Sequence, residues 1–459
     1  MKDLVNTFWE DEGLPTLMEF GKVPNVSPAF DAEWEKNGHM QKAADMLAEW
    51  VKSRNVAKTV EIKELPGRTP LIYIEIAGQK EGTVLMYGHM DKQPEMDGWR
   101  EGLDPWKPVR EGEHLYGRGL ADDGYAIFAA IGAIETARSV GAALPRIVIL
   151  IEGSEESGSE DLPAYLEVLK PEIGSPQAVI TLDSEGWSPD HLSLTESLRG
   201  IVNGYLRIKT INAPLHSGLA TGVVPSVSRI LHILLSRIED TESGRIINTV
   251  VNPEIPDDVR NKLKQVANVI GEHFIEVYEL PEALRPVGAD VHEHVERNFW
   301  EAGMEVTGLK GLPHPERAGN VLASELYVKL SFRIPPLVKA TDAAFELKRV
   351  FEANPPYGAE VTFEAKEMDN GWLSTPFSEK GKRAVWESSQ ETYGADPIET
   401  GIGASIPFIG MMARQFPDAD QIVIGVLSPS SRAHGPNENL HIPRAKRLTE
   451  WLARFLTKF

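Results

Sequence analysis

The sequence predicts an α/β protein with a largely parallel sheet covered by helices, into which a smaller α+β domain is inserted. Two observations carry this prediction. Short, continuously apolar runs alternate with helical segments over roughly the first 190 residues, as strands do when both faces of a parallel sheet are buried. The middle of the chain instead has strands in which apolar and polar residues alternate, which is typical of a sheet with one solvated face.

The buried strands and their helices follow one another along the chain. An alanine-rich helical segment, Tyr125 to Val140, lies between two apolar runs, so strand, helix and strand succeed each other as in a parallel crossover. Met40 to Val51 and Leu448 to Phe455 carry apolar residues at helical spacing. The expected buried strands are residues 71–76, 83–87, 146–151, 178–182 and 421–426.

The inserted domain is expected at residues 198–370. Leu326 to Phe332 and Val361 to Ala365 alternate between apolar and polar side chains, which predicts half-buried strands. Helical spacing recurs around residues 230–235 and 259–270. The expected organisation is therefore a first domain formed by residues 1–197 and 371–459, interrupted by the insert at 198–370.

Composition excludes several function classes. The chain has 459 residues, 42% hydrophobic and 25% charged, which is ordinary for a globular protein of two or three domains. Its 47 basic and 68 acidic residues give a net charge of −21, which disfavours nucleic acid and anionic membrane surfaces as partners. No apolar run reaches the ~18 residues that could span a bilayer. With no cysteine and no apolar leader at its N-terminus, the expected protein is a cytoplasmic enzyme without thiolate chemistry.

Chemically active side chains follow the predicted buried strands. Parallel strands present their carboxyl ends at one edge of a sheet, where ligands bind. Taken singly, each motif has a simpler explanation, such as a helix cap for Asp122-Asp123 or solvated surface for Glu155-Glu156. Together, four carboxylates and two imidazoles at one edge would repel each other unless cations were bound, and oxygen and nitrogen ligands suit zinc, manganese or cobalt. The motifs are GHMD (88–91), GRGLADDG (117–124), EGSEESG (152–158), DSE (183–185) and RAHGPNE (432–438).

These motifs, in this order, resemble those of the di-zinc metallopeptidase family that contains aminoacylases, carboxypeptidase G and carnosinase-like dipeptidases. The resemblance spans residues 88–438. It implies a catalytic α/β domain, an inserted lid and dimerisation domain, and two zinc ions per subunit, with manganese or cobalt as alternatives. It also implies a homodimer formed through the lid domain.

The resemblance assigns a role to each motif residue. Asp91 matches the acid that orients a histidine ligand, a contact that fixes the ring tautomer. Glu155 matches the general base, which accepts a proton from the attacking water and passes it to the leaving amine. The matched metal ligands are His89 and Asp183 for one zinc, Glu156 and His434 for the second, and Asp122 as the bridge between them.

Residues of and near the insert match a second group. His216, in APLHSG, matches a lid histidine that stabilises the oxyanion in the partner's active site. Arg333 matches the residue that holds the substrate carboxylate, and Ser405 with Gly403 matches a substrate-binding turn. A surface loop residue and a solvent-facing ion-pair partner are the simpler interpretations of His216 and Arg333. Gly124 and Gly401 replace a lysine and an arginine common in relatives, which leaves substrate detail open.

The predicted function is a metal-dependent dipeptidase that cleaves the amide bond of dipeptides or other short peptides. An N-acyl-amino-acid deacylase with the same metal site is the alternative. A di-metal phosphoesterase would need phosphate clamps, for which Arg118 and Arg432 are the only motif candidates. A non-catalytic binding protein would be expected to have lost the base or a ligand. His292 and His294 are interpreted as surface histidines of the insert.

Overall fold

The computed structural model describes residues 1–459, apart from the side chain of Pro429, and the chain divides into two units. The first contains Met1–Thr195, Ser374–Glu399 and Ile406–Phe459, and the second contains Glu196–Leu373 and Thr400–Ser405. The expected insert at residues 198–370 agrees with the second unit to within a few residues at each end. The difference is that the second unit also contains Thr400–Ser405, a short segment distant in sequence. The predicted fold class is confirmed.

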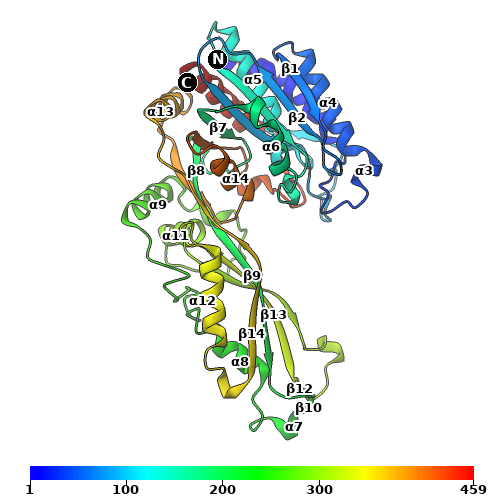
Figure 1. Cartoon of the computed structure of the whole chain (residues 1–459), viewed down its shortest axis with the longest axis vertical. Coiled ribbons are helices and arrows are strands. Elements are labelled where there is room, and N and C mark those ends of the chain that lie inside the picture. Colours follow the sequence, from blue (N-terminus) through cyan, green and yellow to red (C-terminus); the bar gives the residue numbers. More distant parts are fainter. The chain divides into compact units, whose positions relative to one another are not determined.

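The first unit is built on a six-stranded sheet with helices packed around it (Figure 1). Its strands β6, β3, β7 and β17 run parallel to one another. The strands β1 and β2 are joined to it in antiparallel pairs. In spatial order the strands are β1 (Thr59–Lys63), β2 (Leu71–Ile76), β6 (Arg146–Glu152), β3 (Thr83–His89), β7 (Ala178–Thr181) and β17 (Asp420–Val423).

Both faces of this sheet are buried, which explains why its strands are continuously apolar. Alternate residues such as Ile149 join one core with the apolar sides of α4, α5 and α15. On the other face Tyr87 stacks on Phe408 of α14, with ring centroids 4.2 Å apart. The helices of this unit are α1 (Lys2–Phe8), α2 (Leu14–Gly21), α3 (Trp34–Asn37), α4 (His39–Ser53), α5 (Tyr125–Ser139), α6 (Leu162–Ile173), α13 (Glu379–Tyr393), α14 (Pro407–Gln415) and α15 (Ile442–Lys458).

The second unit contains a four-stranded antiparallel sheet, in the order β11 (Gly303–Lys310), β13 (Glu325–Ile334), β9 (Gly200–Lys209) and β14 (Glu360–Asp369). One face packs on helices α8 and α12 to form a separate core, whereas the alternating residues of the other face are partly exposed. The predicted half-buried strands are thus present. Its helices are α7 (Ser217–Ala220), α8 (Val227–Leu235), α9 (Asp257–Ile270), α10 (His273–Glu276), α11 (Val291–Phe299) and α12 (Ala340–Glu352).

Short strands complete the fold. They form one two-stranded sheet and two three-stranded sheets. Among the described residues, none of the helices is both long enough and apolar enough to cross a membrane. The short strands are β4 (Val109–Glu111), β5 (His114–Tyr116) and β18 (Asn439–His441); β10 (Leu215–His216) and β12 (Val321–Leu322); and β15 (Trp372–Leu373), β8 (Ser193–Leu198) and β16 (Ile398–Ile402).

Candidate metal centre

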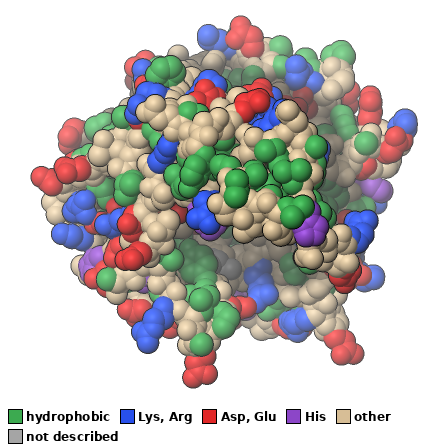
Figure 2. Space-filling view, turned by 90° about the horizontal axis from the view of Figure 1, so that it is seen from below, with side chains coloured by type: hydrophobic (Ala, Val, Ile, Leu, Met, Phe, Trp, Pro, Cys, Tyr) green, Lys and Arg blue, Asp and Glu red, His purple; other side chains and the backbone are tan. Residues whose placement is uncertain are grey.

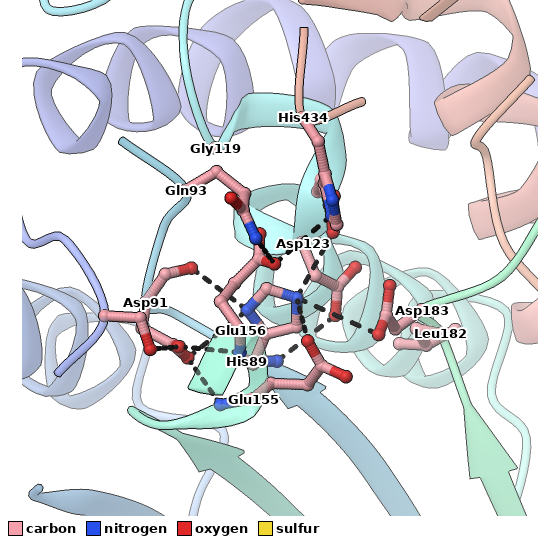
Figure 3. A network of polar contacts seen from close by, with 12 residues as sticks. His89, Asp91, Gln93, Gly119, Asp123, Glu155, Glu156, Leu182, Asp183 and His434 are labelled. Carbon is pink, nitrogen blue, oxygen red and sulfur yellow. Dashed lines mark hydrogen bonds and ion pairs between the residues drawn. The ribbon is translucent and has the colours of Figure 1, made fainter. Parts of the chain in front are cut away.

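The residues predicted to bind metal lie together at the carboxyl ends of the parallel strands (Figure 3). His89 is the last residue of β3, and Asp183 lies two residues beyond the end of β7. Asp122 comes from the turn that precedes α5, Glu156 from the turn after β6, and His434 from the loop between β17 and β18. The sheet thus brings together segments more than 300 residues apart in the sequence.

Two groups of three donors form within this cluster. His89, Asp122 and Asp183 offer ligand atoms that all lie within 4.8 Å of one another, and Asp122, Glu156 and His434 do the same. In the first group, His89 Nε2 lies 3.3 Å from Asp122 Oδ1 and 3.8 Å from Asp183 Oδ2. In the second, His434 Nε2 lies 3.0 Å from Asp122 Oδ2 and 3.2 Å from Glu156 Oε2.

Asp122 belongs to both groups, and its two oxygens face different histidines. Oδ1 lies toward His89 and Oδ2 toward His434. A carboxylate in this arrangement can contribute one oxygen to each of two neighbouring cations. The arrangement therefore contains two adjacent donor groups that share one residue.

The charges of the cluster are unbalanced. Burial raises the pKa of Asp183 to about 7, and the nearby charges of Asp122 and Glu156 add to this effect. Burial also raises the pKa of Glu156. The pKa of His434 rises to about 11 although burial opposes the charged ring, because Asp122 and Glu156 accept its hydrogen bonds. Cations at the two donor groups would relieve the repulsion between these buried carboxylates.

The donor chemistry fits a pair of divalent metal ions. Each group combines one imidazole nitrogen with carboxylate oxygens, and the chain has no cysteine sulfur to offer. Nitrogen and oxygen donors of this kind suit zinc, manganese or cobalt. His89, Asp122 and Asp183 would hold one ion, and Asp122, Glu156 and His434 the other.

Asp91 contacts both the turn after β6 and His89. Its carboxylate accepts hydrogen bonds from the backbone N–H groups of Glu155 and Glu156, at 3.1 and 2.9 Å, and from the Ser27 hydroxyl at 2.6 Å. His89 Nδ1 lies 3.0 Å from the backbone carbonyl oxygen of Asp91 and 3.4 Å from its Oδ1. The fully buried Asp91 therefore orients His89 through its carbonyl and carboxylate oxygens, and its carboxylate holds the position of both glutamates.

Glu155 lies at the centre but belongs to neither donor group. Its Oε2 is 3.9 Å from His89 Nε2, and its side chain is mostly buried. Burial raises the pKa of Glu155 well above its ordinary value, and repulsion from Asp183 adds to this effect. Its neighbour Glu156 turns toward His434 instead, so the two adjacent glutamates face different partners.

The structure also shows supporting residues whose roles were not predicted from the motifs. Gln93 donates a hydrogen bond from Nε2 to Glu156 Oε2 at 2.6 Å. The Tyr125 hydroxyl donates to the carbonyl of Leu182, next to Asp183. The position of Gln93, two residues after Asp91, is the only signal in the sequence that points to its role.

A buried ion pair joins the turn that carries Asp122 to the loop that carries His434. Arg118 NH1 donates to Glu438 Oε2 at 2.7 Å, and both side chains are only 1% exposed. Glu438 Oε1 accepts from the backbone N–H groups of Gly119 and Asp122, and Arg118 NH2 donates to the Gly435 carbonyl. Arg118 is therefore paired with Glu438, whereas a phosphoesterase would use this arginine to bind phosphate.

Replacing Arg118 with methionine should lower the free energy of unfolding by about 3–5 kcal/mol, because Glu438 would stay buried without its charged partner. Urea unfolding of the purified variant measures this change. Lys36→Ala removes an exposed ion pair with Glu33 in the same unit and should change stability far less. A loss no larger than that of the control would mean that the pair does not hold the two loops together.

The remaining predicted residues lie in the second unit. Arg333, on β13, donates from NH1 to the Ser405 hydroxyl at 2.9 Å, and Gly403 accepts a hydrogen bond from Arg199 through its carbonyl. His216 is exposed at the end of β10, where its Nδ1 accepts from the N–H of Gly218. Arg333 and the turn at 403–405 are thus neighbours, as the substrate-binding interpretation requires, whereas His216 lies elsewhere in the unit.

The surface interpretation of His294 is wrong. His294 lies on α11 and is only 8% exposed, and within the described part of the chain neither of its ring nitrogens has a hydrogen-bond partner. His292, on the same helix, is partly exposed. The H-x-H spacing places the two rings on different sides of the helix, because residues two positions apart do not share a face.

An open α/β sheet with two adjacent donor groups for divalent cations, and a further carboxylate beside them, is typical of a metal-dependent hydrolase. The chain belongs to peptidase family M20/M25/M40, whose family model matches residues 85–458. This agrees with the resemblance noted from the motifs, and it makes the protein a metallopeptidase.

The alignments with individual relatives span nearly the whole chain. A cysteinylglycine-S-conjugate dipeptidase from Corynebacterium striatum is 24% identical over 464 residues, which cover 97% of this chain and 98% of the relative. A human beta-Ala-His dipeptidase is 24% identical over 94% of this chain and 87% of its own length. The solved structure of the dipeptidase Dug1p from Saccharomyces cerevisiae matches with a TM-score of 0.74 and 21% identity, covering 100% of this chain and 97% of that one. The last comparison establishes a shared fold.

Proposed function

We propose that the protein is a dipeptidase that hydrolyses the amide bond of dipeptides or other short peptides with water activated by two zinc ions. The observation that carries the proposal is the pair of donor groups sharing Asp122, with Glu155 mostly buried beside them. The names of the relatives, which are dipeptidases, support the same substrate class. Manganese or cobalt would suit the same donors.

The proposed ligands are those of the two donor groups. Bound there, the metal pair would polarise the substrate carbonyl and lower the pKa of a water molecule. His89 and Asp183 would hold one ion, Glu156 and His434 the other, and Asp122 both. Asp91 would keep His89 in the tautomer that leaves Nε2 free to bind metal, because Asp91 contacts the ring at Nδ1.

Glu155 is the proposed general base. Its carboxylate lies beside His89 without belonging to a donor group, so it stays free to accept a proton from the attacking water. The same carboxyl group would then donate that proton to the nitrogen of the leaving amine. Asp91 contributes by fixing the backbone of Glu155, which limits the positions that the carboxylate can take.

Arg333 is the proposed site for the free carboxylate of the substrate. A guanidinium binds a carboxylate through two parallel hydrogen bonds. NH1 is already oriented by the Ser405 hydroxyl, so part of the ordering cost of binding is removed before substrate arrives. Ser405 and the backbone of Gly403 would contact the same end of the substrate.

We also propose that two chains form a homodimer through the second unit, in which His216 stabilises the oxyanion in the partner's active site. An exposed apolar group near His216 supports an interface, with Leu219 85% and Val223 84% exposed. Figure 2 shows hydrophobic side chains gathered on the face that is seen from below. The cysteine-free, acidic composition supports a cytoplasmic location as a further part of the proposal.

A substrate panel tests the proposed function. Metal-loaded protein should hydrolyse free-amine dipeptides such as Ala-Leu faster than the tripeptide Ala-Ala-Leu or N-acetyl-leucine, as measured by released leucine. Cleavage of N-acetyl-leucine in preference to the dipeptides would move the protein to the deacylases. No cleavage of any member of the panel would contradict the proposed function.

Mixing two inactive variants tests the role of His216 across the dimer. His216→Ala and Glu155→Gln should each be nearly inactive alone, but subunit exchange between them should restore activity. The reason is that a mixed dimer contains one site with an intact base and an intact partner histidine. The rate of Ala-Leu hydrolysis before and after exchange measures the effect. A mixture that stays inactive while mixed dimers form would show that His216 does not act in the partner's site.

A further inference from the structure

A cavity of about 780 Å³ lies within the second unit, next to Arg333. Its size falls in the range of about 300–1,000 Å³ that is typical of small-molecule sites. Its walls come from α10 and the irregular segment that follows it, from α11, and from the start of β11. No part of the proposed metal centre contributes to it, so its chemistry can be considered separately.

One end of the cavity is cationic and lacks compensating charge. Arg199 is nearly buried, and its hydrogen bonds go to the backbone carbonyls of Gly403, Arg297 and Glu301. Within the described part of the chain, neither Arg199 nor Arg333 has a carboxylate at ion-pair distance. Burial lowers the pKa of Arg199 to about 10, and repulsion from Arg333 adds to the effect. Two neighbouring guanidinium groups without an anion favour a ligand that brings a carboxylate.

The wall formed by α11 carries an unsatisfied histidine. His294 lines the cavity, and its two ring nitrogens have no partner among the described residues. The backbone that precedes α11 covers the ring closely: a Cβ on Gly288, whose φ is +112°, would lie 2.8 Å from His294 Cδ2. A buried imidazole that lacks hydrogen bonds is costly, so a ligand that offers a donor or an acceptor would be stabilised there.

Most of the remaining wall is apolar, and the charged side chains of Glu239, Arg285, Arg297 and Glu305 also line the cavity. Tyr278, Leu284 and Val287 line the cavity and are 49%, 57% and 62% exposed. Ile275 and Met304 add half-buried apolar surface. Apolar side chains left exposed around a concave site favour an occupant with an apolar body of its own.

We propose that this cavity receives the side chain of the substrate residue that carries the free carboxylate, that it favours a large aromatic side chain, and that His294 hydrogen-bonds to a polar atom on that ring. The inference rests on the proposed function in one respect, which is that Arg333 holds the carboxylate. A carboxylate bound at Arg333 would place the adjoining side chain at the cavity, because Arg333 lines it. The mostly apolar wall and the unsatisfied imidazole of His294 match an aromatic ring with a polar group, such as that of tyrosine.

Filling the cavity tests its role in specificity. In wild-type protein kcat/KM should be higher for Ala-Tyr and Ala-Phe than for Ala-Gly. Ile275→Trp should lower the ratio of kcat/KM for Ala-Phe to that for Ala-Gly by about tenfold or more, since the added indole occupies the space of the substrate ring. Val269→Trp, on α9 and outside the cavity, is the matched control and should keep the wild-type ratio. An unchanged ratio in Ile275→Trp would overturn the inference.

His294→Phe tests the polar contact without reducing the cavity greatly. The variant should lower kcat/KM for Ala-Tyr relative to Ala-Phe, because the hydroxyl would lose its partner. A Tyr-to-Phe ratio equal to that of the wild type would remove His294 from the proposal. This variant also provides an independent result if Ile275→Trp does not fold.

Calorimetric binding of free amino acids separates this inference from the proposed function. L-Phenylalanine should bind the wild-type protein more tightly than glycine, and Ile275→Trp should abolish the difference. That result would support the cavity assignment even if no peptide were hydrolysed, in which case only the proposed function would fail. Equal binding of the two amino acids to the wild-type protein would overturn the inference even if peptides were hydrolysed normally.

Discussion

Replacing Glu155 with glutamine should reduce dipeptide hydrolysis by about 10²–10⁴-fold, the range that a general base contributes. The substitution removes the proton acceptor but keeps the size of the side chain. Because Glu155 lies outside both donor groups, the metal content of the variant should equal that of the wild type. Initial rates on Ala-Leu and metal analysis of the same preparation measure both quantities.

Glu160→Gln provides the matched control for this prediction. Glu160 lies five residues further along the same segment and is exposed. The control should therefore keep wild-type rates. A Glu155→Gln variant that retained most of its activity would exclude Glu155 as the base, and one that lost metal would show that Glu155 is a ligand instead.

Removing single ligands should change the metal content in a pattern that identifies the bridge. His89→Ala and His434→Ala each affect one donor group, so each should lose about one of the two bound ions. Asp122→Ala affects both groups and should lose both ions. All three variants should lose nearly all activity. Elemental analysis of dialysed protein measures the number of ions per chain.

His39→Ala is the control for these ligand variants, since His39 begins α4 and lies outside both donor groups. It should retain two ions and full activity. A wild-type protein that binds one ion, or an Asp122→Ala variant that still binds two, would contradict a shared carboxylate at this position.

Much of the fold follows from local sequence pattern. Residues 146–151 and 83–87 are predicted strands because a short, continuously apolar run is typical of a sheet covered on both faces, and both are present in β6 and β3. The clustering of His89 and Asp183 is likewise predictable, because each lies at the end of a parallel strand. The residues that follow parallel strands lie at a common edge of the sheet, so residues distant in the sequence are expected to lie close together there.

The features that could not be predicted depend on contacts between distant segments. Thr400–Ser405 joins the second unit, where Arg199 donates to Gly403 and Arg333 to Ser405, and no local pattern at 400–405 signals this. The burial of His294 depends on the chain near Gly288 folding back over α11. Such arrangements depend on tertiary packing. The local pattern of an amphipathic helix does not show whether another segment covers one of its polar residues.

The most direct test of the central claim is the rate of Ala-Leu hydrolysis as metal is returned stepwise to protein stripped by a chelator. Hydrolysis should be absent from the stripped protein and should reach its maximum when two zinc ions are bound per chain, with Glu155→Gln remaining inactive at the same metal content. Full hydrolysis without metal, or a maximum reached with a single ion bound, would contradict the two-metal dipeptidase.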